Sequence, residues 1–106
     1  MTAPQLPRIQ RHDGRTIECE AVFIAPRLRP TDGLLRSLEC EIDPATGLVT
    51  VDGTGQTSQP GVWAAGNVVT PSAQVITAAG AGSASAIAIN GWLLQQDIDT
   101  AFAGRN

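Results

Sequence analysis

The residues best suited to chemistry in this 106-residue chain follow a short apolar run that ends in small side chains. Residues 61–66 read Gly-Val-Trp-Ala-Ala-Gly, and Asn67 comes next. Because Gly66 has no side chain, a large planar ligand can come close to the backbone at this point. The side-chain amide of Asn67 can then hydrogen-bond a hydroxyl group of such a ligand. The pattern predicts a short buried strand that ends in a ligand-contacting turn at Gly66 and Asn67.

A helix predicted directly after this turn adds a second polar feature. Residues 70–72 read Thr-Pro-Ser, which gives a capping residue and a proline at a first helical position. We therefore expect a helix from about residue 73 to about residue 96. The first amides of a helix have no partner within it and attract negative charge. Gln74 and Val75 thus lie where backbone N–H groups would point at the same ligand.

Other catalytic or metal-binding patterns are absent from the sequence. His12 is the single histidine and lies in a predicted turn, so we expect it to be solvated. Cys19 and Cys40 form no CxxC motif, and we expect two reduced thiols. No paired carboxylates or metal cluster occur, so we predict neither a catalytic residue nor a metal site. No GxGxxG follows a strand, so both pyrophosphate loops of a dinucleotide fold are missing.

Composition excludes two classes of partner. The formal net charge is −3 and the pI is near 4.8, which argues against nucleic-acid binding. Residues 68–94 contain no charged side chain and could reach across a bilayer. Polar residues and glycines recur along this stretch, however, so we predict a buried helix of a soluble protein. The amino terminus shows no apolar leader pattern, and we expect a cytoplasmic protein.

The predicted elements form an α/β chain. Asp13-Gly14 lies between two extended runs, residues 8–11 and 16–24, and predicts a hairpin. Residues 21–25 are continuously apolar, as in a strand buried on both faces. The remaining predictions are a short helix from 31 or 32 to 38, a turn at 43–47, a strand at 48–51 and a polar loop at 52–60.

Two ordered motifs carry a family resemblance. Residues 57–68, Thr-Ser-Gln-Pro-Gly-Val-Trp-Ala-Ala-Gly-Asn-Val, closely resemble the T-S-x-P-G-(V/I)-(F/W/Y)-A-A-G-D signature of thioredoxin reductases and related two-dinucleotide flavoproteins. Residues 74–82, Gln-Val-Ile-Thr-Ala-Ala-Gly-Ala-Gly, resemble the start of the family's following helix. The resemblance extends over residues 8–95 and includes the runs from Asp13 to Ala25, Arg29-Pro30 and Leu34-Leu35.

The resemblance implies a carboxy-terminal portion of a thioredoxin reductase-like FAD/NAD(P)H oxidoreductase. Residues 1–56 would be the end of the nicotinamide-type domain with the returning linker, and 57–106 the last strand and helix of the FAD-type domain. The intact relative would pass a hydride from NAD(P)H to FAD, then to a disulfide or another acceptor. The family's cofactor-binding positions correspond here to Gly66, Asn67, Gln74 and Val75. Ala78, Ala79, Gly80 and Gly82 would let the helix pack on a sheet.

The sequence departs from the family at two points. Asn67 stands where the family has an acidic residue, and Ala25-Pro26-Arg27 lacks the usual glycine. Because the pyrophosphate loops are missing, we expect the isolated chain to be without FAD and without turnover.

Two hypotheses stay open for what such a chain does. It is one part of a flavoenzyme that needs a complementary amino-terminal segment, or it is a non-enzymatic assembly domain that has lost the cofactor. The helix is apolar nearly all round, which also predicts a homo-oligomer with this helix at or near the interface.

Overall fold

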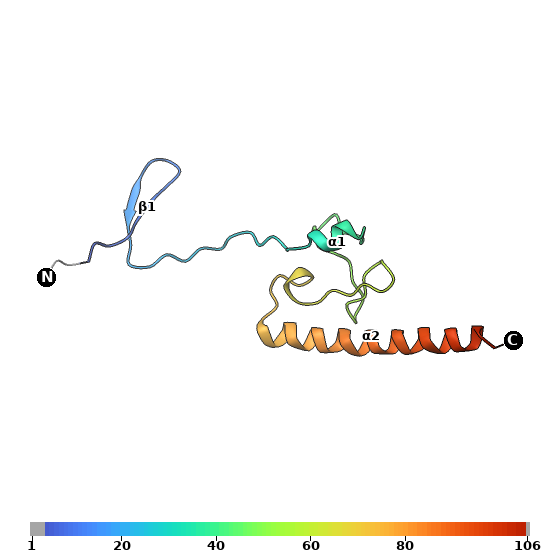
Figure 1. Ribbon diagram of the computed structural model, residues 1–106. Coiled ribbons are helices and arrows are strands. Elements are labelled where there is room, and N and C mark those ends of the chain that lie inside the picture. Colours follow the sequence, from blue (N-terminus) through green and yellow to red (C-terminus); the bar gives the residue numbers. More distant parts are fainter. Residues whose placement is uncertain (1–3, 106) are drawn as a thin grey trace.

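The computed structural model describes residues 4–105 and shows an elongated α/β chain (Figure 1). A hairpin lies at one end, and an extended segment joins it to a loop-rich body alongside a long helix. The radius of gyration is 22.7 Å, against about 13 Å for a compact domain of this length. The predicted α/β class, with a hairpin and a long carboxy-terminal helix, is confirmed. The elements are β1 (Arg8–Gln10), β2 (Thr16–Glu18), α1 (Gly33–Ser37), the 3₁₀ turn η1 (Gly66–Val68) and α2 (Val75–Ala103).

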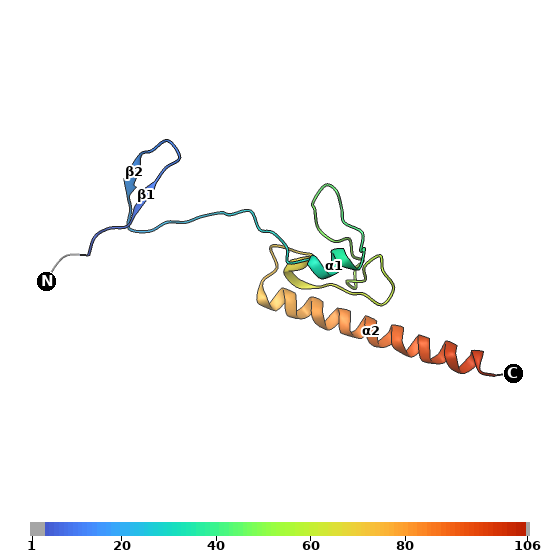
Figure 2. The same cartoon turned by 45° about the horizontal axis from the view of Figure 1, so that its top comes forward.

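The hairpin forms as its turn residues predict (Figure 2). β1 and β2 pair antiparallel with Ile9 opposite Ile17. Gly14 takes a φ of 84° in the turn, a value that side-chain-bearing residues rarely adopt. The second strand was predicted to run to residue 24, but it ends at Glu18.

The strand predicted at residues 21–25 is wrong in this chain. Residues 19–32 follow an extended path with no regular element, and the side chains of Phe23 and Ile24 are 97% and 78% exposed. No amide of residues 20–31 donates a hydrogen bond to another described residue. A strand buried on both faces needs neighbouring strands and covering layers. Residues 4–105 provide neither for this segment.

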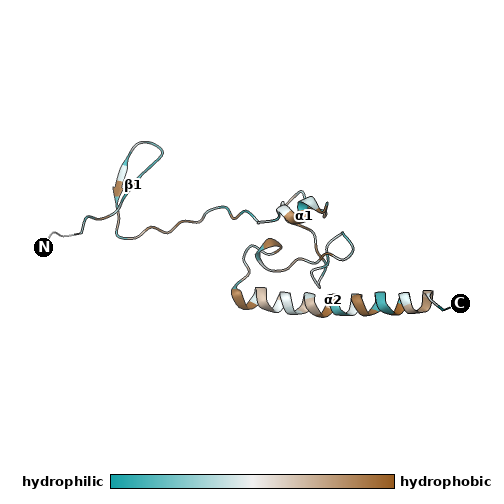
Figure 3. Cartoon of the chain, in the orientation of Figure 1, coloured by the Kyte–Doolittle hydropathy of each residue, from teal (hydrophilic) through white to brown (hydrophobic). Residues whose placement is uncertain are grey.

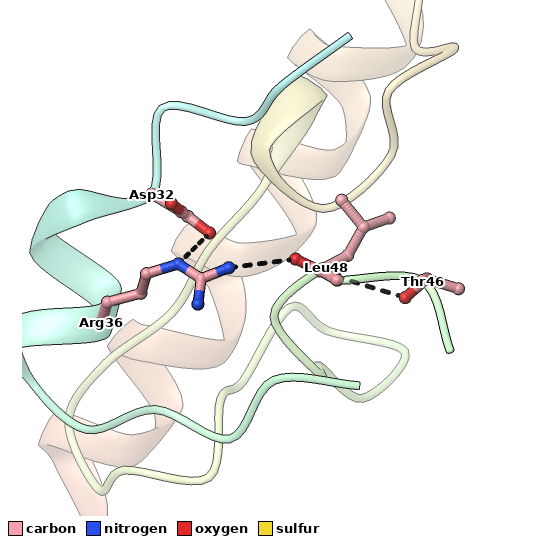
Figure 4. A network of polar contacts seen from close by, with 5 residues as sticks. Asp32, Arg36, Thr46 and Leu48 are labelled. Carbon is pink, nitrogen blue, oxygen red and sulfur yellow. Dashed lines mark hydrogen bonds and ion pairs between the residues drawn. The ribbon is translucent and has the colours of Figure 1, made fainter. Parts of the chain in front are cut away.

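The body is held by a small core and by an ion pair at α1. Leu35, Cys40, Val49 and Ala64 are its buried apolar residues. Arg36 pairs with Asp32 at 2.9 Å and donates to the Gly47 carbonyl at 3.3 Å (Figure 4). The predicted short helix is confirmed, and so is the turn at 43–47, where the Gly47 amide reaches the Asp43 carbonyl at 2.7 Å.

The strands predicted at 48–51 and 61–66 shrink to single bridges. Ile42 pairs with Val49, and Gln56 pairs with Trp63. Each bridge lies just beyond a tight polar turn, which brings the two flanking segments together over one pair only. A longer ladder would need further strands beside them.

Helix α2 begins later and ends later than predicted. Thr70 and Pro71 form a turn instead of the first helical residues, because the Ala73 amide bonds the Thr70 carbonyl at 2.9 Å. Gln74 is the residue before the helix, with extended dihedral angles of −81° and 166°. The helix continues through residues 97–103 and stops before Gly104. A Gln95–Asp99 hydrogen bond of 2.8 Å spans one of these turns.

The prediction that this helix is buried is wrong. Ser85 is the one buried residue of α2, because the body covers one side of it, and apolar stretches alternate with polar ones along its length (Figure 3). In the part of the chain that the structure describes, no helix combines the length and apolar character needed to cross a bilayer.

Candidate functional site

The first site element is the turn at Gly66. Ala65 is extended, and Gly66 follows with a φ of 83°, in the left-handed region that favours glycine. A methyl group at Gly66 would meet only the Ala78 Cβ, at 3.6 Å, which is an ordinary contact. Glycine is therefore favoured at this position by the backbone conformation and not by a lack of space. The turn carries the chain from the buried Ala64 to the start of α2.

Asn67 is held by the loop that follows it. Its Nδ2 donates to the Pro71 carbonyl at 3.0 Å and lies 3.4 Å from the Ala73 carbonyl. Asn67 also lines an open cavity of about 210 Å³. The predicted site residue thus faces a hollow, while its amide nitrogen is already bound by its own chain.

The amino terminus of α2 is open. The Gln74 carbonyl accepts the first helical hydrogen bond, from the Ala78 amide at 2.8 Å. The Gln74 side chain does not cap the helix. The amides of Val75, Ile76 and Thr77 therefore have no partner in their own helix. The Val75 side chain is 89% exposed, so any role of this residue falls to its backbone.

The structure brings only part of the predicted site to one surface. Gly66 and Asn67 lead through one loop into Gln74 and Val75, and of these four residues Asn67 alone lines the cavity. The other lining residues are Leu28, Arg29, Pro30, Thr31, Val68 and Pro71.

The segment 28–31 was not predicted as part of the site. It reaches Asn67 from the extended linker, where Pro26 and Pro30 oppose helix formation. In the sequence, Pro26 and Pro30 were the residues that indicated an extended segment here.

A second cavity, of about 170 Å³, is lined by residues 51–55 and by part of α2. The loop is pinned to the helix, because the Ser85 hydroxyl donates to the Thr54 carbonyl at 2.7 Å. Hydrogen bonds from the Thr54 side chain, then from the Thr54 and Gln56 amides, lower the pKa of Asp52. These contacts stabilise the loop and offer no reactive group.

The predicted packing of small helix residues on a sheet is not seen. Added side-chain atoms at Gly80 and Gly82 would meet nothing within 4 Å. Ala78 alone of the four lies near the site turn, across from Gly66. The remaining face has no sheet beside it within residues 4–105.

The ionisable and sulfur groups of residues 4–105 form no reactive cluster. Cys40 is buried with its Sγ 3.6 Å from the Thr57 hydroxyl, and Cys19 is half-buried; both are free thiols. His12 is exposed in the hairpin turn. No group of metal-ligating side chains comes together among the described residues.

Comparisons with known proteins agree with one another. A family model described as pyridine nucleotide-disulphide oxidoreductase matches residues 4–83. The F component of alkyl hydroperoxide reductase from Pseudomonas aeruginosa strain PAO1 is 36% identical over 74 residues, which are 69% of this chain and 14% of that protein. The crystal structure of HlmI superposes with a TM-score of 0.81 at 40% identity, covering 97% of this chain and 32% of that chain. The chain thus spans a small part of each relative.

Proposed function

This chain belongs to the pyridine nucleotide-disulphide oxidoreductase family, and on that premise we propose that it supplies one wall of the FAD site in a thioredoxin reductase-like flavoprotein. The observation that carries the proposal is the junction of the Asn67 turn with the open start of α2. One loop joins a side-chain amide that lines a cavity to backbone amides without helical partners.

The residues of this junction fit one end of the cofactor. FAD, when bound, supplies the hydride-accepting chemistry. Gly66 leaves the backbone open, Asn67 suits a ribityl hydroxyl, and the amides after Gln74 suit an oxygen edge that gains negative charge. Helix termini stabilise such charge by roughly 0.3–1 kcal/mol. Nothing in the sequence fits the pyrophosphate, since no GxGxxG motif is present.

The proposal therefore includes a complementary amino-terminal segment, which carries the pyrophosphate loops and the rest of the sheet. The unpaired backbone and exposed apolar side chains of residues 20–25 support such a complementary segment, because an isolated soluble chain rarely leaves an extended apolar run uncovered. The HlmI comparison supports it too, since this open arrangement matches about a third of a longer chain. Within the proposal, residues 1–56 end the nicotinamide-type domain, and residues 57–106 complete the FAD-type domain.

Visible absorption of the purified protein tests the proposal. The full chain would be purified alone with added FAD, and also co-expressed with the region of HlmI that lies outside the match. We expect a flavin spectrum at equal stoichiometry in the pair and a colourless isolated chain. A stable pair that stays colourless would favour the assembly domain that has lost its cofactor. An isolated chain that retains stoichiometric flavin would show that the complementary segment is unnecessary.

A further inference from the structure

The side chain of Asn67 closes the loop between η1 and α2. Within this loop the Thr70 amide bonds the Gly66 carbonyl at 2.9 Å, and the Ala73 amide bonds the Thr70 carbonyl at 2.9 Å. These backbone bonds leave the Pro71 and Ala73 carbonyls free. The Asn67 Nδ2 lies 3.0 Å and 3.4 Å from them and joins both ends of the loop.

This arrangement fixes what Asn67 can offer to a ligand. A side-chain amide has two N–H donors and one carbonyl acceptor, and here the nitrogen is directed at the two backbone carbonyls. The Oδ1 accepts no hydrogen bond from residues 4–105. A ligand in the adjoining cavity therefore meets an acceptor at Asn67, which suits a hydroxyl group and disfavours a phosphate or carboxylate oxygen.

An ionised aspartate cannot make the contacts that Asn67 makes in the loop. A carboxylate only accepts hydrogen bonds, so at least one of its oxygens would face the Pro71 and Ala73 carbonyls without a proton between them. Asn67 and both of its contacts are exposed, so solvent weakens this repulsion, but a carboxylate would still lose the two contacts that the amide nitrogen makes. The acidic residue of the family signature and the asparagine of this chain are thus not equivalent for the backbone around them.

We infer that Asn67 is a positioning residue that locks the Gly66–Gln74 loop through its amide nitrogen and, in the same orientation, presents Oδ1 as an acceptor for a ligand hydroxyl. The lock sets the direction in which α2 starts, and with it the direction of the first free amides of the helix. The identity of the ligand rests on the proposed flavin site. The lock itself is a property of the chain without ligand.

Amide hydrogen exchange of the full isotope-labelled chain, corrected for intrinsic rates, tests the lock without flavin. The reporters are the Thr70 and Ala73 amides, with the Cys40 amide as a reference in the core. At about pH 7, Asn67→Asp and Asn67→Ala should each lower the protection of the two reporters by about tenfold, the scale of one or two lost hydrogen bonds. The matched control is Asn90→Asp, the same change at an exposed position of α2, and it should leave the reporters unchanged.

The pH profile separates the lock from a general packing role. The two carbonyls should raise the pKa of the new carboxyl, while Arg29, the charged residue that lines the same cavity, opposes that shift. Because the protonated acid can donate, Asn67→Asp should regain most of its protection near about pH 4, below the raised pKa, and lose it as the pH rises. Asn67→Ala should stay unprotected at both values.

Three results would overturn the inference. In the first, the reporter amides of the wild type exchange as fast as those of an unstructured peptide. In the second, the reporters in Asn67→Asp are as protected at neutral pH as in the wild type. In the third, Asn90→Asp lowers the protection of the reporters as much as Asn67→Asp does. If the reporters stay protected but the reconstituted pair binds no flavin, the proposed function is refuted and the inference about the lock is not.

Discussion

At the scale of single residues, Asn67 is the most informative, because the family signature has an acidic residue at this position. From the sequence, Asn67 could be interpreted either as a working substitute or as a sign of lost function. Its two contacts to backbone carbonyls give it a local structural reason to be asparagine. The same contacts leave an acceptor of the kind that a carboxylate would offer to a hydroxyl.

Asn67→Leu should weaken FAD binding in the reconstituted pair by about 1–3 kcal/mol, because a buried hydrogen-bond partner on the ligand loses its acceptor. The measurement is a fluorescence or calorimetric titration with FAD. Asn90→Leu, on an exposed part of α2, is the control and should bind FAD as wild type does. Equal affinity in wild type and Asn67→Leu would exclude the cofactor role of this side chain.

Acid should loosen the loop that starts at Asp52. Its pKa is lowered by hydrogen bonds from Thr54 and Gln56, so the folded state favours the ionised form. Its contribution to stability is therefore present above the ordinary carboxyl pKa and is lost as the pH falls through the lowered value. Denaturant unfolding across acidic pH should show a smaller loss of stability in Asp52→Asn than in wild type. The same slope in both would contradict this.

At the scale of elements, a close contact joins the 51–55 loop to α2. Gly55 has a φ of 87°, and a methyl group there would lie 2.6 Å from both the Ala64 carbonyl oxygen and the Ser85 hydroxyl. Gly55→Ala should therefore lower the free energy of unfolding by about 1–3 kcal/mol. Gly53 in the same loop has open space around it, and Gly53→Ala should change stability by no more than about 0.5 kcal/mol. Equal effects of the two substitutions in denaturant unfolding would show that the loop does not pack as described.

Elements with local causes could be predicted from the sequence, and elements that need neighbours could not. The Asp13-Gly14 hairpin and the helix after Asp32 depend on residues within a few positions of each other, and both formed. The apolar run at 21–25 has the composition of a central strand, yet a strand needs partners that residues 4–105 lack. In the site, Gly66 and Asn67 could be predicted, because a small residue followed by a side-chain amide is visible in the sequence. The approach of residues 28–31 depends on tertiary structure and had no periodic signal.

At the scale of the whole molecule, the chain leaves more apolar surface open than a self-contained domain does. Its extents are 85 × 32 × 20 Å, and the core formed by residues 4–105 has four buried apolar residues. Trp92 is half-buried and packs edge-to-face on Trp63 at 5.7 Å. Val75, Ile76, Ile87 and Leu93 are exposed along α2. A surface of this kind favours cover by another segment or another copy.

In the absence of the complementary segment, we expect the chain to form homodimers or larger oligomers through α2. Leu94 and Phe102 are 58% and 64% exposed, and Ile98 lies between them at a spacing of four residues, so the three form one apolar stripe on the helix. Two copies related by two-fold symmetry can cover this stripe by pairing their helices. Sedimentation at micromolar concentration should show a dimer or larger species for the wild type.

Leu94→Glu should shift this equilibrium towards monomer, because pairing would then enclose an unpaired charge. Gln96→Glu adds the same charge two residues along, on another face of the helix, and should sediment like wild type. A wild-type monomer whose two tryptophans are both shielded from a soluble quencher would show that the chain closes its core alone. A monomer with accessible tryptophans would show that the open surface is tolerated, and would leave the complementary flavoprotein segment as the partner for α2.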